Sequence, residues 1–343
     1  MMKTSINDFE ARKREHVSLA LSPENVATEC HVFDTVILKH EAMPDLDRDD
    51  INISSHRFGK SVSNPFIISS MTAGHKDALR INRHLMEAAS CHDWAMGVGS
   101  QRRELFDKEA FKEWQSLRRD FPDIILFSNI GLAQLIETPL AHILALTQNI
   151  QAAALIIHCN PLQEMIQPEG TPFFKGCWQA LERLIATIDM PVIVKETGCG
   201  FSRETLIRLN AIGVSAVDVS GLGGTHWGRI EGARAGEGSI AQKTANVFKY
   251  WGINTVQCVK EAVSLNPSFE VWGSGGVRHG LDAAKLFALG ATTVGFAKPL
   301  LEAALHSAQA VKECMTAIEY ALKVAMFCTG SRVIHELKGK ICL

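Results

Sequence analysis

Eight short apolar runs constrain the fold of this chain more than any other feature of its sequence. Each run has the length and apolar character of a buried β-strand, and longer segments with helical spacing separate them. The runs are PFIISS (65–70), AMGVGS (95–100), ILFSNI (125–130), ALIIHC (154–159), PVIVKE (191–196), AVDVSG (216–221), EVWGSG (270–275) and TTVGFA (292–297). Strands that alternate with amphipathic helices predict parallel βα units, and eight such units close a barrel.

The segment 77–92, between the first two runs, illustrates the helical spacing, because Leu79, Leu85, Met86 and Ala89 can share one face of a helix. An open doubly wound sheet is the main alternative to a barrel. It predicts a GxGxxG motif between the first strand and the first helix. No such motif opens the first unit, so we predict a (β/α)8 TIM barrel of the α/β class.

The length of the chain, 343 residues, fits one barrel preceded by an extension. A rule of ~150 residues per domain would suggest two domains, but α/β barrels commonly exceed 250 residues as one unit. The sequence contains no low-complexity linker. We expect an N-terminal extension over residues 1–60, the barrel over 61–330 and a C-terminal tail over 331–343.

Charge and cysteine content exclude several classes of protein. The net charge of −2 gives no overall field that would attract nucleic acid or an anionic membrane. No stretch approaches the ~18 apolar residues of a membrane span, and the charged N-terminus lacks the apolar run of a signal peptide. The nine cysteines are scattered without CxxC spacing, which is typical of reduced thiols. We therefore expect a cytoplasmic protein with neither a nucleic-acid nor a membrane partner.

Polar residues stand at the end of every predicted strand. Active sites of barrel enzymes lie at the C-terminal ends of the strands, so these residues would converge. They are Thr72, Ser100, Gln101, Arg102, Asn129, His158, Asn160, Lys195, Ser220, Ser274, Gly275, Gly276 and Lys298. A purely structural barrel needs none of them there, and we interpret the set as one active site.

Glycines after the last two strands indicate a phosphate site. In GSGGVRHG, Gly275 and Gly276 let backbone N–H groups approach an anion, and a helix begins shortly afterwards. The segment FAKP places Ala297 and Lys298 at the start of the eighth helix. Barrels commonly bind phosphate in these two loops. A third glycine-rich run, 220–238, is long enough to be a mobile loop over the site.

Three further features have more than one interpretation on the residues alone. In HCNPLQE (158–164), a carboxylate beside amides suits Mg²⁺, although a lone glutamate is more often solvated or caps a helix. Lys195 ends the run VIVK and would point into the barrel mouth. It could form a Schiff base, neutralise a cofactor, or pair with Glu196 or Glu231. The basic run ARKREH (11–16) is ordinarily a solvated helix face.

Taken together, several motifs resemble those of type 2 isopentenyl-diphosphate isomerase. The resemblance runs in matching order from Arg12 to about Leu305. The glycine loop is shared with other FMN barrels, whereas HxNxxQE combined with VSGxGGTxxxxIE and the N-terminal RK is highly specific. The motifs are RKREH, SSMTAG, GVGSQR, SNIGLAQ, HCNPLQE, VIVKETGCGFS, VDVSGLGGTHWGRIE and GSGGVRHGLDAAKLFALGA.

The resemblance implies an isomerase that interconverts isopentenyl and dimethylallyl diphosphate in isoprenoid biosynthesis. It implies FMN, Mg²⁺, and NADPH as the reductant that keeps the flavin reduced. The flavin itself would handle the protons with no net redox change, while the protein positions and tunes it. A homo-oligomer, a tetramer or an octamer, is implied as well.

The resemblance also implies roles for individual residues. Flavin contacts would be Met71, Thr72, Ala73, Ser100, Asn129, Lys195, Ser220 and Thr225, and the FMN phosphate cradle would be Gly275, Gly276, Val277, Ala297 and Lys298. Substrate contacts would be Arg12, Lys13, Ser100, Gln101, Arg102, His158, Asn160 and Gln163, with Glu164 as the Mg²⁺ ligand. Candidates for the catalytic set are Lys195, His158, Gln163 and Glu231. Ala73 and Lys298 depart from the family, which usually has glycine at both positions.

Two rival functions predict different residues. An FMN-dependent 2-hydroxy acid oxidase needs a pattern like SxHGGR after the sixth strand, but here Leu222 stands in the place of the base and Thr225 in that of the arginine. A non-catalytic flavin- or diphosphate-binding protein would not need to keep Lys195, Gln163 and Glu164 together. Both are therefore weaker interpretations than the isomerase.

Overall fold

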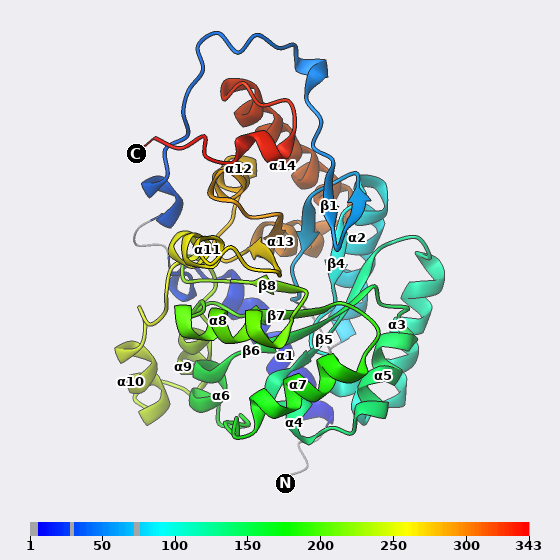
Figure 1. Ribbon diagram of the computed structural model, residues 1–343. Coiled ribbons are helices and arrows are strands. Elements are labelled where there is room, and N and C mark those ends of the chain that lie inside the picture. The colour runs from blue at the N-terminus through cyan, green and yellow to red at the C-terminus, as the bar shows by residue number, and fades with distance from the viewer. Residues whose placement is uncertain (1–5, 28–30, 72–75, 343) are drawn as a thin grey trace.

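A closed parallel barrel forms the centre of the molecule (Figure 1). The computed structural model describes residues 6–27, 31–71 and 76–342, and within them eight strands close the barrel in the order β10-β3-β4-β5-β6-β7-β8-β9. The strands are β3 (Phe66–Ile68), β4 (Ala95–Gly97), β5 (Leu126–Gly131), β6 (Ala154–Cys159), β7 (Val192–Glu196), β8 (Ala216–Asp218), β9 (Glu270–Gly273) and β10 (Thr293–Phe296). Each lies within one predicted apolar run, apart from β5, which extends one residue beyond its run to Gly131, and this agreement confirms the (β/α)8 fold.

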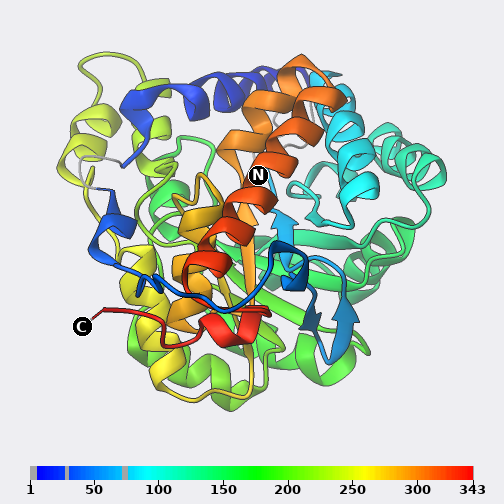
Figure 2. The same cartoon turned by 90° about the horizontal axis from the view of Figure 1, so that it is seen from above.

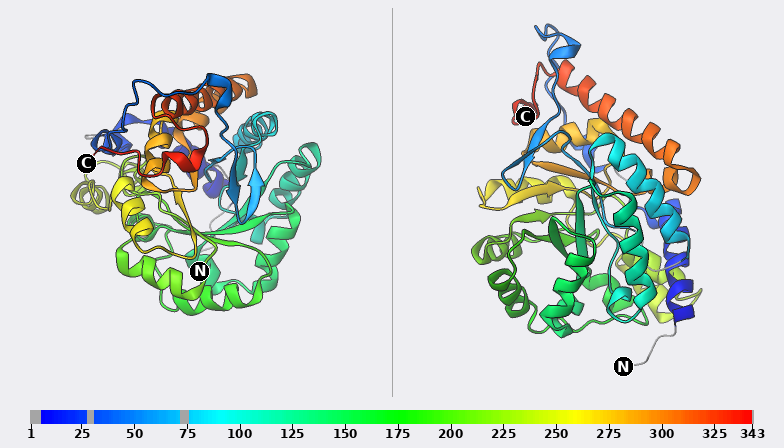
Figure 3. Two further views of the ribbon diagram at one scale, coloured as in Figure 1. Left: turned by 45° about the horizontal axis from the view of Figure 1, so that its top comes forward. Right: turned by 90° about the vertical axis from the view of Figure 1, so that its right-hand side faces the viewer.

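Helices surround the barrel because each crossover between parallel strands must return the chain to the same end of the sheet (Figure 3, left). Their bounds are α2 (Lys76–His92), α3 (Lys108–Asp120), α4 (Leu132–Glu137), α5 (Leu140–Asn149), α6 (Pro161–Ile166), α7 (Cys177–Thr187), α8 (Arg203–Ile212), α9 (Trp227–Arg234), α10 (Ile240–Val247), α11 (Thr255–Ser264), α12 (Gly280–Leu289), α13 (Lys298–His306) and α14 (Ala308–Cys328). Side chains of Asp107, Ser202 and Asn254 cap α3, α8 and α11 by accepting backbone N–H bonds.

The buried face of α2 differs from the predicted one at a single position. Leu85, Met86 and Ala89 are fully buried, as expected, but Leu79 is 36% exposed. Ala78 and Ile81 occupy the buried face in its place. The helix turns by about 100° per residue, so Leu79 lies one step off the stripe that continues through Ile81 and Leu85.

Two layers of apolar side chains hold the barrel together. The inner layer combines small residues with two large rings and is formed by Ile67, Ala95, Phe127, Ala154, Ile156, Ile193, Ala216 and Trp272. A hairpin of β1 (Ser55–Arg57) and β2 (Lys60–Val62), which the sequence did not predict, packs Phe58 against Phe127 and Trp272. The outer layer, between strands and helices, contains most of the other buried apolar residues.

The N-terminal extension crosses the barrel and then joins the C-terminal tail. Helix α1 (Ile6–Leu21) contacts α9 and α13, and Figure 3 (right) shows it along one side of the barrel. Farther along, Leu38 pairs with Ile341 and Asn52 with Val333, so the blue and red segments run side by side in Figure 2. Short 3-10 turns interrupt these regions; they are η1 (Pro23–Asn25), η2 (Val32–Thr35), η3 (Arg48–Asp50), η4 (Arg103–Leu105) and η5 (Ile334–Leu337). Among the described helices, none combines the length and apolarity that crossing a bilayer requires.

Candidate active site

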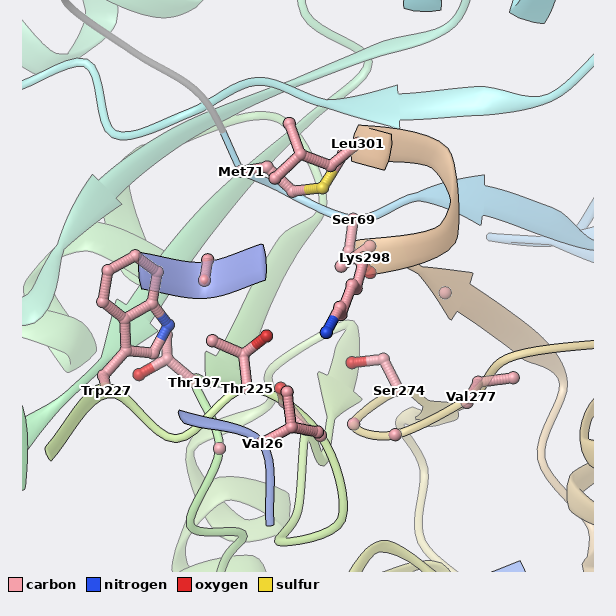
Figure 4. A pocket seen from close by; sticks show the side chains of 18 of the residues that line it. Val26, Ser69, Met71, Thr197, Thr225, Trp227, Ser274, Val277, Lys298 and Leu301 are labelled. Atoms are coloured by element: carbon pink, nitrogen blue, oxygen red, sulfur yellow. The ribbon is translucent and has the colours of Figure 1, made fainter. Parts of the chain in front are cut away.

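Two adjoining cavities lie at the C-terminal ends of the strands. The larger has a volume of about 470 Å³, and Figure 4 shows side chains from the strand ends, the glycine loops and α13 around it. The smaller has a volume of about 100 Å³ and is lined mainly by polar groups. Residues common to both linings are Lys13, His16, Ser70, Met71, Lys195, Thr197 and Trp227. Helix α1 supplies Lys13 and His16, so the extension of the same chain covers the barrel mouth.

Two glycine loops form one wall of the larger cavity. Gly275 and Gly276 have φ values of +98° and +80°, which side-chain-bearing residues rarely adopt. A Cβ on Gly276 would meet the carbonyl oxygen of Gly223, and one on Gly224 would lie 2.5 Å from the backbone nitrogen of Gly276. The loops therefore approach each other closely only because they lack side chains. As predicted, the loop that contains Gly275 and Gly276 passes from β9 through a tight turn to α12, and Lys298 is the first residue of α13.

The run 220–238 is not the long loop that we expected. Residues 227–234 of this run form α9, and the side chain of His226 caps the helix by accepting from the backbone N–H of Arg229. The cap and the close packing of the glycines leave only short connections on either side. This segment is a fixed wall of the site, with Trp227 facing both cavities.

Two serine hydroxyls at the end of β3 need a partner. Ser69 and Ser70 line the larger cavity, and neither Oγ atom has a hydrogen-bond partner among the described residues. Buried hydroxyls without partners are rare in folded proteins. Neither serine was among the predicted site residues, although both open the motif SSMTAG. A polar ligand in the larger cavity would satisfy them.

Lys195 forms a buried ion pair that the sequence did not predict. Its Nζ lies 2.8 Å from Oδ2 of Asp218 and donates to Oγ of Ser274 at 3.0 Å. Pairing with Glu196 or Glu231 was one of the roles that the sequence left open for Lys195, and the structure pairs it with Asp218 instead of either glutamate. Adjacent residues alternate across a strand, so Glu196 points to the opposite face of β7, while Glu231 belongs to a different cluster. Lys195 thus presents its charge to both cavities from a fixed position.

Glu196 instead holds the turn that follows β7. Its Oε2 accepts from the backbone N–H groups of Thr197, Gly198 and Cys199. Burial raises the pKa of Glu196 to about 7, although these hydrogen bonds oppose the shift. This carboxylate lines neither of the two cavities and has a structural role.

Positive charge gathers at the smaller cavity. Arg12 and Lys13 reach it from α1, and Arg102 reaches it from the loop after β4. Burial, together with the charges of Arg12 and Arg102, lowers the pKa of Lys13 to about 8. An anion bound here would relieve the repulsion among these cations, so the smaller cavity is suited to an anionic group.

His158 is held as a neutral imidazole at the smaller cavity. The side-chain amide of Asn129 donates to the carbonyl oxygen of Val98 at 3.0 Å, so its Oδ1 accepts the proton on His158 Nδ1 at 2.8 Å. Burial, with the charges of Lys13 and Lys195, lowers the pKa of His158 to about 3. Nε2 of the neutral ring is therefore a hydrogen-bond acceptor.

Glu231 is the centre of a buried polar cluster behind the smaller cavity. It accepts from Nε2 of Gln163 at 2.8 Å, lies 2.9 Å from Nε2 of His16 and pairs with Arg234. Burial alone would raise the pKa of Glu231, but the contacts with His16, Gln163 and Arg234 lower it to about 2. With its amide oriented to satisfy both neighbours, Gln167 joins Arg12 to Glu231 at 3.0 and 3.1 Å. The charge of Glu231 therefore orients the groups that line the cavity.

Glu164 is buried at the edge of the smaller cavity. It accepts from Asn160 Nδ2 at 3.2 Å and from the backbone N–H of Thr171. Each carboxylate oxygen can accept more than one bond, so lone pairs remain on the carboxylate. The group can serve as one ligand of a hydrated cation.

Most of the predicted site residues converge on these cavities. Those that line at least one of them are Arg12, Lys13, Met71, Ser100, Arg102, Asn129, His158, Asn160, Gln163, Glu164, Lys195, Ser220, Thr225, Gly275, Gly276, Val277, Ala297 and Lys298. Gln101 lines neither; it is fully buried, and its Oε1 accepts from Ser128 and from the backbone of Asn129. Thr72 and Ala73 lie outside the described residues.

This chain has close relatives by sequence among known proteins. A family model described as FMN-dependent dehydrogenase matches residues 140–342. A protein of Legionella pneumophila strain Paris named isopentenyl-diphosphate delta-isomerase is 65% identical over 341 residues, covering 99% of this chain and 100% of the relative. One of the same name from Bdellovibrio bacteriovorus is 48% identical, covering 99% of both chains.

Solved structures with a similar fold are more distant in sequence. A mandelate oxidase mutant with benzaldehyde superposes with a TM-score of 0.66 at 17% identity, covering 99% of this chain and 98% of that one. The recombinant flavin-binding domain of baker's yeast flavocytochrome b2 has a TM-score of 0.66 at 17% identity, with coverage of 98% and 85%. At such identities the likeness shows the fold alone.

The buried ion pair generates a stability prediction. Asp218→Asn leaves the charge of Lys195 buried without its counter-charge, which costs about 3–5 kcal/mol of unfolding free energy. Asp120→Asn, in the exposed pair with Arg83, is the matched control and costs about 0–1 kcal/mol. Urea unfolding of both variants checks this. Equal losses of unfolding free energy in the two variants would contradict a buried ion pair at the barrel mouth.

Proposed function

The chain belongs to the family of isopentenyl-diphosphate delta-isomerases, and we propose that it interconverts isopentenyl diphosphate and dimethylallyl diphosphate with bound FMN. The observation that carries this proposal is the junction of the two cavities. A glycine-walled cavity opens onto a cationic one, and Lys195 lines both. The product would serve isoprenoid biosynthesis, and the reaction moves a double bond with no net redox change.

The larger cavity fits FMN. Its volume of about 470 Å³ is within the range of cofactor sites. The backbone of Gly275, Gly276, Val277 and Ala297 would hold the phosphate, with Lys298 adding charge. Lys298 Nζ donates to the carbonyl oxygen of Leu21 at 3.0 Å, so it also ties α1 to this cradle.

Other residues of this cavity would hold the ring. The unpartnered hydroxyls of Ser69 and Ser70 would form hydrogen bonds with it. Met71, Ser220 and Thr225 would contact it as well. Reduced FMN, when bound, supplies an electron-rich ring that can take up and return a proton. Lys195, fixed by Asp218 and Ser274, would favour negative charge on that ring.

The smaller cavity would bind the diphosphate. Arg12, Lys13 and Arg102 offer charge-assisted hydrogen bonds to its oxygens, and binding would raise the depressed pKa of Lys13. The diphosphate would likewise favour the protonated form of His158, whose Nε2 would then donate to it. Holding the anionic end of the substrate in this way orients the alkene toward the larger cavity.

Glu164 would bind Mg²⁺ that arrives with the diphosphate. A magnesium ion usually takes one or two carboxylates and completes its shell with water and substrate phosphate. Glu164 is buried, and Asn160 fixes its orientation at 3.2 Å. This donor set fits such an ion, because a single protein carboxylate leaves positions for phosphate oxygens.

Gln163 and Glu231 would position groups around the reacting carbons. Glu231 is ionised at neutral pH because its pKa is about 2, so it accepts rather than supplies a proton. It holds Nε2 of Gln163 at 2.8 Å, which turns the side chain of Gln163 toward the substrate. Helix α1 and Trp227 would limit the access of water to the site. Through Arg12 and Lys13, the extension 1–60 would contribute to the substrate site of the barrel 61–330.

Further properties belong to the same proposal and follow from the family resemblance. NADPH would reduce the flavin, and the enzyme would act in the cytoplasm as a homo-oligomer, a tetramer or an octamer. Exposed large apolar side chains in and just after α10 are consistent with self-association. Ile240, Val247 and Trp251 are 85%, 81% and 60% exposed there.

The structure does not favour the rival oxidase function. Leu222, at the position where that chemistry needs a histidine base, pairs with Asn254 in a β-bridge and lines neither cavity. Thr225 cannot supply the positive charge that binds a carboxylate substrate. A 2-hydroxy acid would find no base and no charged partner at these positions.

The proposed activity is tested by incubating the protein with isopentenyl diphosphate, Mg²⁺ and dithionite-reduced FMN under anaerobic conditions. We expect dimethylallyl diphosphate to accumulate to equilibrium, and we expect no turnover without flavin. Product analysis by NMR, which distinguishes the two isomers of equal mass, measures both. Binding of FMN without any isomerisation would favour the non-catalytic alternative, and equal turnover without flavin would overturn the proposal.

The glycine cradle is tested by Gly276→Ala. The new methyl group would meet the carbonyl of Gly223, so FMN affinity should fall by about 10-fold or more. Gly176→Ala is the matched control, because its φ of +88° is similar but no atom lies within 4 Å of the new Cβ. Fluorescence titration with FMN measures both affinities. Similar affinities in the two variants would exclude this loop from the flavin site.

The role of α1 is tested by Arg12→Ala. Loss of a charge-assisted bond to the diphosphate should raise KM by about 10- to 100-fold while FMN affinity stays unchanged. Arg14→Ala, on the exposed face of the same helix, should leave KM unchanged. An unchanged KM in Arg12→Ala would show that the helix does not touch the substrate.

A further inference from the structure

Three potential metal ligands converge outside both cavities. His31 precedes η2 in the N-terminal extension, while His279 and Asp282 stand at the start of α12. Their ligand atoms all lie within 4.8 Å of one another. The cluster sits directly after the glycine loop 275–276, on the side of the loop where the extension crosses it.

Each histidine faces one oxygen of the Asp282 carboxylate at a separation close to that of two ligands on a tetrahedral metal ion. His31 Nε2 lies 3.5 Å from Asp282 Oδ1, and His279 Nδ1 lies 3.6 Å from Asp282 Oδ2. Ligands about 2.1 Å from a tetrahedral zinc ion stand about 3.4 Å apart. The pairs are thus too far apart for ordinary hydrogen bonds and close to the separation that a shared ion requires.

Two of the ligand atoms lack partners. Asp282 is 1% exposed, and neither its Oδ1 nor Nε2 of His31 has a hydrogen-bond partner among the described residues. A buried carboxylate oxygen without a donor is costly, and a cation would remove that cost. His279 Nδ1 accepts only a long bond of 3.3 Å from the backbone N–H of Asp282, so that bond competes weakly for the lone pair.

The site is organised by contacts that do not involve an ion. Phe33, two residues after His31, is fully buried, and Lys285 of α12 donates to its carbonyl oxygen at 2.9 Å. The ring of His31 lies edge-on to Phe33 and to His279, with centroids 5.6 and 6.2 Å apart. These contacts hold His31 over the start of α12, so the ligands need little rearrangement.

We propose that His31, His279 and Asp282 form a zinc site that pins the N-terminal extension to the loop leading into α12. Two imidazoles and one carboxylate are ligands that zinc prefers, whereas Mg²⁺ and Ca²⁺ prefer oxygen alone. Water would complete the tetrahedron, and the half-exposed ring of His279 leaves a path from solvent. The positive charge of nearby Arg278 opposes a cation, and the carboxylate of Asp282 offsets it.

The position of the site gives it a consequence for the fold. Val32, next to His31, packs close to Gly223: a Cβ added to Gly223 would lie 3.0 Å from the side chain of Val32. The extension therefore also lies against the second glycine loop. A zinc ion at His31 would therefore hold the extension across both loops of the larger cavity. The ion would act on the order of this segment and would take no part in the reaction.

The proposal is tested by zinc binding to the full chain with FMN and excess Mg²⁺ present. Chelator-treated wild type, His31→Gln and His279→Asn are compared by equilibrium dialysis and elemental analysis, with His142→Gln on the exposed face of α5 as the control. Asparagine at 279 keeps an N-cap acceptor for α12. We expect wild type and the control to bind one zinc ion that both site variants lose or bind about 100-fold more weakly. Equal stoichiometry and affinity in all four proteins would overturn the site.

Two further measurements identify the zinc ligands and test whether zinc pins the extension. X-ray absorption should show only nitrogen and oxygen ligands at about 2.0–2.1 Å, with imidazole scattering. A sulfur shell would contradict the proposal. Hydrogen exchange of residues 31–36 should slow on adding zinc to wild type and stay unchanged in His31→Gln. Unchanged exchange in the wild type would exclude the pinning of the extension.

Discussion

The in-register pairing of parallel strands places the central charges of the site. Gly131, His158, Lys195 and Asp218 are successive Cα partners across β5, β6, β7 and β8. Partners in a parallel sheet point to the same side, so three polar side chains enter the barrel mouth in one row. The row begins with glycine, because a Cβ at Gly131 would meet Oε1 of Gln134 and would lie 3.1 Å from Nε2 of His158. Barrel closure, which fixes this register, therefore also sets the chemistry of the mouth.

Burial and neighbouring charges act differently on the ionisable groups at the barrel mouth. Lys195 has Asp218 as a counter-charge at 2.8 Å, whereas His158 has no acid beside it and burial lowers its pKa to about 3. Glu231 keeps its charge because His16, Gln163 and Arg234 surround it. The cations at the smaller cavity then favour an anion, and the glycine loops favour a phosphate next to it. One barrel mouth thus offers two neighbouring anion sites with Lys195 between them.

Sequence periodicity predicted the strands well because a buried parallel strand must be apolar along its whole length. It failed where contacts depend on register or on distant segments. Asp218 is the partner of Lys195 through a strand pairing that no local pattern reveals. The hairpin of β1 and β2, which turns at Phe58, has no strong turn signal in the sequence. Leu79 was predicted on the buried face of α2, but it is one residue, about 100° of helix rotation, away from Ala78, which is buried instead. Most residues carried over from the family resemblance converge on the cavities, whereas Gln101 lies behind them.

We propose that one barrel mouth holds a flavin and a diphosphate in adjoining cavities. A crystal structure of the protein with FMN, Mg²⁺ and isopentenyl diphosphate tests it most directly. We expect the flavin phosphate at Gly275 and Gly276, and the diphosphate among Arg12, Lys13 and Arg102 with the metal on Glu164. A flavin outside the glycine loops, or a diphosphate that touches none of these cations, would contradict it.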